Sequence, residues 1–275
     1  VMRGDSLLGN TYDIRLSAQA RKTLADLSGV DISTWKKYVG HERDYRYTDD
    51  LVEDVIKTHG HFPCKYNDFE FIYFHVTTSA NGCSAIKKYG ILDLKHAYLC
   101  KESELRVFLD QHDVFIDLAR GFLSYMRKSY DISYNAGAYP ITGTREYSCR
   151  SIGRKFYYNY TTYGFLSVWE QSPYGGQVHR RPEILFNIDN LLRSNLSREW
   201  EQSHFPYEIT ALVSGNDIVF DGDDDQSDKD KVLMYLTMAY NTAFGEPFEN
   251  VLLMRNGIQI PADNIIEIKP LSHWN

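Results

Sequence analysis

The chain of 275 residues is long enough for one large domain, and 43% of its residues are hydrophobic and 24% are charged. This balance is that of an ordinary globular protein and excludes a disordered, collagenous or coiled-coil chain. The net charge of -7 argues against a protein that coats nucleic acid through bulk electrostatics, so any contact with a polyanion must be local.

The four cysteines include no CxxC pair, so their spacing predicts neither a zinc ribbon nor a disulfide framework. No apolar stretch approaches the roughly 20 residues that a bilayer span requires, and the N-terminus has no basic region followed by an apolar one. We therefore expect a protein of the reducing cytoplasm with no part in the membrane.

Residues 1–65 are predicted to form a helical prefix. Apolar residues between Leu16 and Leu27 recur at helical spacing, and Asp31 or Ser33 is the candidate cap of a following helix. Another apolar stripe, over residues 50–58, predicts a further helix before a glycine and a proline stop it.

The period of the pattern then changes. Phe69–Thr78 (FEFIYFHVTT) is rich in aromatic and β-branched residues, which predicts a buried strand with His75 near its end. Ser79 is expected to cap a helix that stops at Gly90, and a short strand follows.

A helical insertion is predicted at about residues 100–155. Within it, the apolar residues of Glu102–Arg127 follow helical spacing and indicate a long helix.

From Phe156 onward the pattern favours strands, at FYYNYTTYGFLSVW, EILFNID, YEITALV and DIVF. A helix is expected at about Asp228–Phe244, and NVLLM and IIEI are the last two strands. The predicted class is α+β, with the helical prefix followed by one domain over residues 66–275.

Several familiar kinds of site are excluded or disfavoured. The acidic loop at residues 221–230 does not fit an EF-hand, because the sixth and twelfth positions counted from Asp221 are Gln226 and Val232 where glycine and glutamate are needed. A solvated loop that caps the next helix is the better interpretation. His59 and His61 have no carboxylate or cysteine at a recurring ligand offset, so we expect no metal. The chain contains no GxSxG, GxGxxG or Walker motif.

The segment Arg145–Tyr163 (REYSCRSIGRKFYYNYTTY) interleaves cations with aromatic rings. Cations that hold phosphates beside rings that stack on bases are typical of single-strand nucleic acid binding, whereas the alternative is a basic loop that leads into an aromatic strand. A second basic cluster follows in a glycine-containing loop. The candidate nucleic-acid-binding residues are Arg145, Arg150, Arg154, Lys155, Arg180 and Arg181.

Two segments together resemble the ADP-ribosyltransferase superfamily: FHVTTS with its following helix, and the C-terminal GEPFENVLLMRNGIQIPADNIIEI. The resemblance covers about residues 69–269 and leaves the prefix and the insertion outside it. It implies an ADP-ribosyltransferase-like split mixed β-sheet core that binds NAD as its substrate.

In the branch with a histidine, a tyrosine and a glutamate, the resemblance assigns His75 to a ribose hydroxyl of NAD and Thr77, on the same strand face, to the nicotinamide ribose. Glu249 best matches the catalytic glutamate, and Glu208 and Glu183 are its rivals because each also opens a predicted apolar strand.

The middle motif departs from the family pattern, because the chain has YGFLS where many members carry a tyrosine or a Ser-Thr-Ser run. Tyr163 or Ser167 is the candidate for the nicotinamide site, and Tyr174 is a candidate for stacking on the ring.

The leading functional hypothesis is a mono-ADP-ribosyltransferase that resembles the toxins of bacterial toxin–antitoxin and antiphage systems and modifies RNA or single-stranded DNA. An antitoxin protein would then be a partner. A protein target or plain NAD hydrolysis would use the same carboxylate. A noncatalytic module that holds a nucleotide or a partner on the same scaffold is the alternative from another class, and transfer of an RNA 2'-phosphate to NAD is a third, for which the chain lacks a basic quartet.

Overall fold

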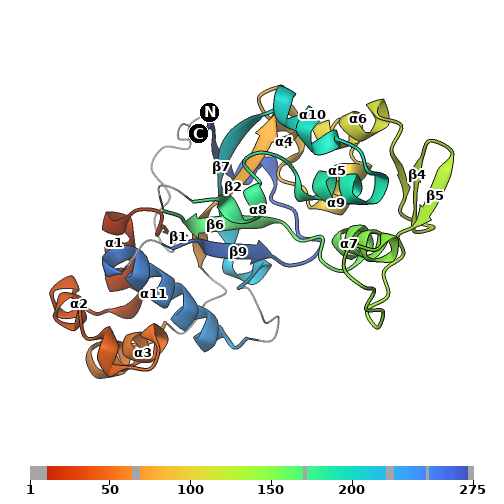
Figure 1. Cartoon of the computed structure of the whole chain (residues 1–275). Helices are drawn as coiled ribbons and strands as arrows, with labels where there is room; N and C mark the ends of the chain where they lie inside the picture. Colours follow the sequence, from red (N-terminus) through yellow and green to blue (C-terminus); the bar gives the residue numbers. More distant parts are fainter. Residues whose placement is uncertain (1–10, 64–68, 170–171, 221–225, 246–247, 272–275) are drawn as a thin grey trace. The chain divides into compact units, whose positions relative to one another are not determined.

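The computed structural model describes residues 11–63, 69–169, 172–220, 226–245 and 248–271 (Figure 1). These residues form a mixed fold of helices and largely antiparallel sheets, which agrees with the predicted α+β class. No helix in the described ranges is long and apolar enough to cross a membrane.

The chain folds into two compact units. The first comprises Val1–His75, Tyr163–Ser172 and Thr210–Leu253, and the second comprises Val76–Thr162, Pro173–Ile209 and Met254–Asn275. The helical prefix therefore shares its unit with segments that lie far along the chain.

The prefix contains the helices that its pattern predicts. They are α1 (Ser17–Ser28), α2 (Ile32–Tyr38) and α3 (Thr48–His59), with a short 3-10 turn at Glu42–Asp44. Asp31 caps α2 by accepting a hydrogen bond from the Ser33 backbone N–H at 2.7 Å.

The predicted C-terminal helix is confirmed as α11 (Asp228–Phe244). It packs against the prefix within the first unit (Figure 1). The Ser17 hydroxyl and the Arg21 guanidinium both donate to the carbonyl oxygen of Ala243, at 3.0 and 3.2 Å. The Tyr240 hydroxyl donates to Glu42 at 2.7 Å, so polar bonds fasten the C-terminal end of α11 to the prefix.

The main sheet has the strand order β10-β7-β2-β6-β9-β8 in the described residues, and β1 pairs beside β2. Its strands are β1 (Thr11–Tyr12), β2 (Glu70–Ser79), β6 (Tyr163–Ser167), β7 (Phe205–Ser214), β8 (Ile218–Val219), β9 (Asn250–Met254) and β10 (Ile265–Pro270). Short 3-10 turns at Gly215–Asp217 and Ala262–Asn264 precede β8 and β10. These strands confirm the predictions made from FEFIYFHVTT, YEITALV, DIVF, NVLLM and IIEI.

The second unit is built mainly from short helices around an apolar core. The helices are α4 (Ser84–Tyr89), α5 (Leu94–Leu99), α6 (Glu104–Gln111), α7 (Arg145–Tyr157), α8 (Tyr174–Gln177), α9 (Glu183–Leu192) and α10 (Leu196–Ser203). Leu109, Ile152, Phe156, Leu185 and Trp200 lie in its core.

The long helix predicted over Glu102–Arg127 is wrong in its second half. After α6 the chain forms a three-stranded antiparallel sheet of β3 (Phe115–Asp117), β4 (Phe122–Tyr125) and β5 (Lys128–Asp131). Met126 and Arg127 make the two-residue turn between β4 and β5 with φ of 46° and 62°. Such a turn normally uses asparagine and glycine, so the sequence carries no hairpin signal here.

Three predicted strands are also wrong or shorter than expected. Phe156 and Tyr157 end helix α7, and β6 begins only at Tyr163. EILFNID forms helix α9, because Ile184, Leu185 and Ile188 bury one helical face. The short strand after Gly90 is reduced to a single bridge between Ile91 and Ile260.

The helix after β2 also begins later than predicted. Cys83, not Ser79, occupies the cap position of α4, while the Ser79 hydroxyl accepts a hydrogen bond from the Cys83 backbone N–H at 2.7 Å.

Candidate functional site

Three adjacent strands of the first unit carry the residues that the sequence singles out. His75 lies on β2, Tyr163 and Ser167 lie on β6, and Glu249 immediately precedes β9 (Figure 1). Strand β6 pairs with both of the others, and both pairs are antiparallel. The histidine and the glutamate, 174 positions apart in the chain, therefore flank one strand.

The Nδ1 atom of His75 lies 2.7 Å from the backbone oxygen of Tyr163. A carbonyl oxygen only accepts, so Nδ1 carries the proton of the neutral ring and Nε2 keeps its lone pair. Burial lowers the pKa of His75, and the hydrogen bond to Tyr163 opposes that effect in part. The ring is thus a neutral hydrogen-bond acceptor at Nε2, suited to a ligand hydroxyl.

Glu249 is half-buried, and its Oε1 atom accepts a hydrogen bond from the hydroxyl of Ser172. Ser172 is buried and lies five residues after the end of β6, so a polar group beyond that strand orients the carboxylate that precedes β9. A carboxylate held in this way is pre-organised to face a developing positive charge.

Ser167 is buried and does not stand open to a ligand. Its hydroxyl lies 3.0 Å from that of Thr242 on α11 and accepts from the Asn250 side-chain amide at 2.6 Å. Asn250 is itself only 4% exposed and directly follows Glu249. The predicted nicotinamide residue Ser167 therefore positions the strand that carries the glutamate.

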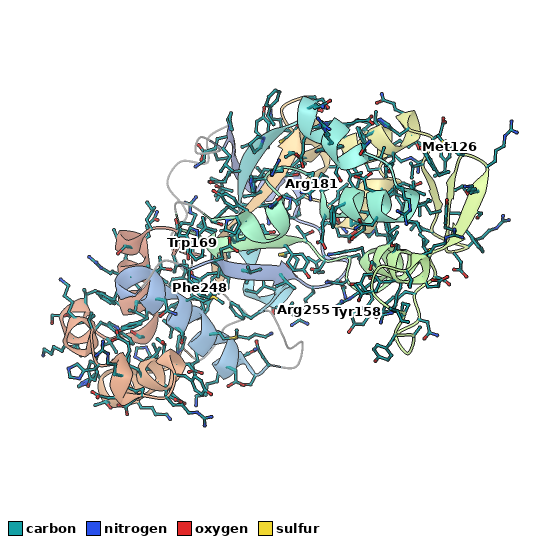
Figure 2. All side chains as sticks on the ribbon, viewed as in Figure 1. Met126, Tyr158, Trp169, Arg181, Phe248 and Arg255 are labelled. Atoms are coloured by element: carbon teal, nitrogen blue, oxygen red, sulfur yellow. The ribbon has the colours of Figure 1, made fainter. Side chains whose placement is uncertain are left out.

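Two exposed aromatic residues, which the sequence reasoning missed, flank Glu249. Trp169 follows β6 and is 37% exposed, and Phe248 precedes Glu249 and is 63% exposed (Figure 2). Because Ser167 pairs with Asn250, the end of β6 and the start of β9 lie at the same end of the strand pair. Only Phe248 adjoins Glu249 in the sequence, and the strand register that brings Trp169 to the same end has no local sequence signal.

The remaining predicted residues belong to the second unit. Thr77 lies two positions after His75 on β2, and Tyr174 begins α8 with its ring 5.5 Å from that of His179. Glu208, on β7, forms an ion pair with Lys269 at 2.9 Å. Glu183 is the first residue of a helix, which corrects its predicted place at the start of a strand, and it pairs with Lys155 at 2.5 Å.

The candidate nucleic-acid-binding cations divide into two groups. Lys155 pairs with Glu183, and Arg180 and Arg181 both pair with Glu201, at 3.0 and 3.6 Å (Figure 2 labels Arg181). Paired cations are a weaker attraction for phosphates than free ones. Arg145, Arg150 and Arg154 share helix α7 with Lys155 but form none of these three ion pairs.

A polar groove that the sequence does not predict lies within the second unit, between α6 and the end of α10. The Glu104 carboxylate there accepts bonds from the Ser79 hydroxyl and the Ala80 N–H, at 2.5 and 2.6 Å, and His204 lies 3.4 Å away. Burial acts to raise the pKa of Glu104, but the bonds from His204, Ser79 and Ala80 outweigh it and hold the pKa below its usual range.

The described residues contain no group of three or more histidine, cysteine, aspartate or glutamate side chains that could hold a metal ion. The acidic loop at residues 221–225 and Cys64 lie outside the described residues. The two other acidic positions, Asp228 and Asp230, lie in the first turn of α11, which Ser227 caps.

A scan against protein-family models, a search of curated proteins and a search of solved structures each returned no match. We therefore argue function from the geometry of this chain.

Proposed function

We propose that the protein is a mono-ADP-ribosyltransferase that uses NAD as its substrate. The observation that carries this proposal is the order of three neighbouring strands: β2 with His75, β6 with Tyr163, and β9 preceded by Glu249. This order brings together the three segments in which the resemblance seeks its histidine, its middle motif and its glutamate.

The strand register sets the distance between the two residues that would contact NAD. Two strand spacings and a three-residue step along β9 separate the Cα atoms of His75 and Glu249 by roughly 14 Å. At this span the two groups contact different parts of one dinucleotide when the Glu249 carboxylate, which precedes β9, turns to the sheet face of His75. His75 would accept a hydrogen bond from a ribose hydroxyl at Nε2, and Glu249 would face the ribose that carries nicotinamide.

The reaction breaks the bond between ribose C1' and the nicotinamide nitrogen, and the electron pair leaves with neutral nicotinamide. Positive charge then develops on the ribose, and the Glu249 carboxylate favours it electrostatically. An acceptor oxygen or nitrogen forms the new bond to C1' and releases its proton. Trp169 and Phe248 are the rings that would stack on the departing nicotinamide.

Water or a protein side chain in place of the acceptor would give NAD hydrolysis or protein modification with the same residues. A noncatalytic module would bind NAD without releasing nicotinamide. A role as a toxin or antiphage effector is the cellular setting that the resemblance suggests.

The test is nicotinamide release from labelled NAD by the parent chain and by Glu249→Gln. Loss of the carboxylate charge should lower turnover by at least a hundredfold, on the order of a lost transition-state contact, while NAD binding measured by calorimetry persists. Glu208→Gln and Glu183→Gln are matched controls that should retain turnover, because both carboxylates are held by lysines.

Loss of turnover in Glu208→Gln or Glu183→Gln but not in Glu249→Gln would move the catalytic role to that rival. A parent chain that binds NAD and releases no nicotinamide, with nucleic acid or cell extract present, would favour the noncatalytic module.

A further inference from the structure

Helix α7 and the loop before it carry an alternating array of rings and guanidinium groups, which we call the Arg–Tyr array: Tyr139, Arg150, Tyr134, Tyr158 and Arg154. The Arg150 guanidinium lies 5.6 Å from the ring centre of Tyr139 and 5.1 Å from that of Tyr134. Tyr134 stacks on Tyr158 with 5.4 Å between ring centres, and Arg154 lies 5.9 Å from the Tyr158 ring.

Packing of α7 against the core of the second unit holds the helical part of the array in place. Ile152 and Phe156 are fully buried in the core of the second unit, which fixes the helix. Gly153 allows a close approach, because a Cβ atom there would lie 2.0 Å from the backbone oxygen of Ile132. Residues on the opposite face of α7 are therefore held in place while remaining open to solvent.

The outer rings of the array are exposed. Tyr139 is 86% exposed and Tyr158, at the C-terminal end of α7, is 56% exposed (Figure 2). Exposed rings in the loop before a fixed helix and at its C-terminal cap are available for stacking by another flat ring.

A cleft of about 600 Å³ lies beside the array, within the second unit. Arg145, Arg150 and Tyr139 line it together with Asp131 and Glu146. The Nε–H of Arg150 is buried and has no hydrogen-bond partner in the described part of the chain. A ligand acceptor that reached it would satisfy a group that is costly to leave unpaired.

The charges in the cleft lining balance, with two arginines against two carboxylates. Asp131 accepts bonds from the Ser133 hydroxyl and N–H, which hold its pKa below the usual range, so it stays ionised. Charge alone therefore attracts a polyanion weakly here, and stacking on the rings must supply most of the affinity and favour unpaired bases over a duplex.

We propose that the Arg–Tyr array and its cleft bind single-stranded nucleic acid, with bases stacked on Tyr139 and Tyr158 and phosphates near Arg145 and Arg154. Binding of the strand stands apart from NAD chemistry, whereas its role as the ADP-ribose acceptor rests on the proposed function. The paired cations Lys155, Arg180 and Arg181 are not part of this surface.

The test measures fluorescence anisotropy of labelled homopolymeric thymidine and uridine strands, and of a duplex of equal length, against the full chain without NAD. We expect the single strands to bind more tightly than the duplex. Tyr139→Leu should weaken strand binding about tenfold, whereas Tyr139→Phe retains it, because the ring and not the hydroxyl stacks. Tyr139 is exposed, so neither change should alter the thermal midpoint.

Arg150→Lys separates stacking from charge, since it keeps the positive charge and loses the planar group that lies between two rings. It should weaken binding severalfold, and Arg120→Ala, an exposed arginine outside the cleft lining, should not. Arg145→Ala should reduce the slope of log affinity against log salt by about 0.7, the value for one phosphate contact, whereas Tyr139→Leu leaves the slope unchanged.

Cys149 also lines the cleft, so a bound strand should slow the alkylation of its thiol. The alkylation rate measures strand binding independently of fluorescence anisotropy. Equal binding of duplex and single strand, or affinities unchanged in both Tyr139→Leu and Arg150→Lys, would overturn the proposal. Glu249→Gln should bind the strand as the parent does, so failure of the NAD hypothesis and failure of this one give different results.

Discussion

At the scale of single residues, one hydrogen bond decides what His75 can do. The carbonyl oxygen of Tyr163 accepts a hydrogen bond from the Nδ1–H of His75, so the other nitrogen of the neutral ring is left as an acceptor. The motif FHVTTS predicts a histidine near the end of the strand, but β2 continues four residues beyond His75 to Ser79. The tautomer of His75 depends on a neighbouring strand that begins 88 residues later, and a local pattern does not predict that pairing. Trp169 and Phe248 were missed for the same reason, because register alone brings them to the same end of the strand pair.

The lowered pKa of His75 predicts how stability depends on pH. The unfolded chain takes up the proton near pH 6.5 and the folded chain only at lower pH, so the free energy of unfolding should fall as pH drops below about 6.5, by at most about 1.4 kcal/mol per pH unit. His75→Gln should remove the part of this pH dependence that His75 contributes. Urea unfolding between pH 5 and pH 8 measures it.

His179 provides the comparison, because burial and then the charge of Arg180 also lower its pKa. His179→Gln should remove a separate share, and the double variant should remove both. If His75→Gln keeps the pH profile of the parent, the folded chain does not disfavour the charged form of His75.

At the scale of elements, the local sequence pattern predicts helices and strands that have a long and unambiguous periodicity. It fails for segments whose secondary structure is decided by packing. Helix α11 and strands β2, β7 and β9 are found where their patterns place them. The hairpin of β4 and β5 was missed because Met126 and Arg127 adopt left-handed backbone angles without glycine or asparagine. Helix α9 was taken for a strand because its short apolar run fits both periods.

Gly164, in the middle of the candidate site, is explained by close packing. A Cβ atom there would lie 2.1 Å from the ring of Tyr73, which is fully buried and cannot move aside. Gly164→Ala should lower the free energy of unfolding by about 1–3 kcal/mol, as overpacking does in a filled core. Urea denaturation measures the loss.

Gly176→Ala is the control, since a Cβ atom there would meet nothing within 4 Å. Equal stability of Gly164→Ala and the parent would mean that β2 and β6 separate easily, and the site would then be less rigid than we infer.

At the scale of the whole molecule, the chain passes between its two units after His75, Thr162, Ser172, Ile209 and Leu253. Composition and pattern predict the helical content of the prefix, but they do not reveal that α1 and α3 pack against α11, because that contact joins segments about 200 residues apart. Within the first unit the prefix packs over helix α11.

A chain that begins at His61 should therefore fail to unfold in a cooperative thermal transition, because α11 loses the prefix residues Trp35 and Glu42, which contact Tyr240. Far-UV circular dichroism follows the transition, and adding a peptide of residues 11–60 should restore it. A truncated chain with the thermal midpoint of the parent would show that the prefix is a separate appendage.

The late position of α11 and Glu249 has a consequence for synthesis on the ribosome. Helices α1 and α3 emerge long before α11, their packing partner, and expose apolar surface until residue 244 has been made. Chaperones have the most apolar surface to bind during this interval. The carboxylate proposed for catalysis follows five positions later, so a prematurely terminated product lacks it. Only a chain translated past residue 254 therefore contains all the strands and side chains of the candidate site.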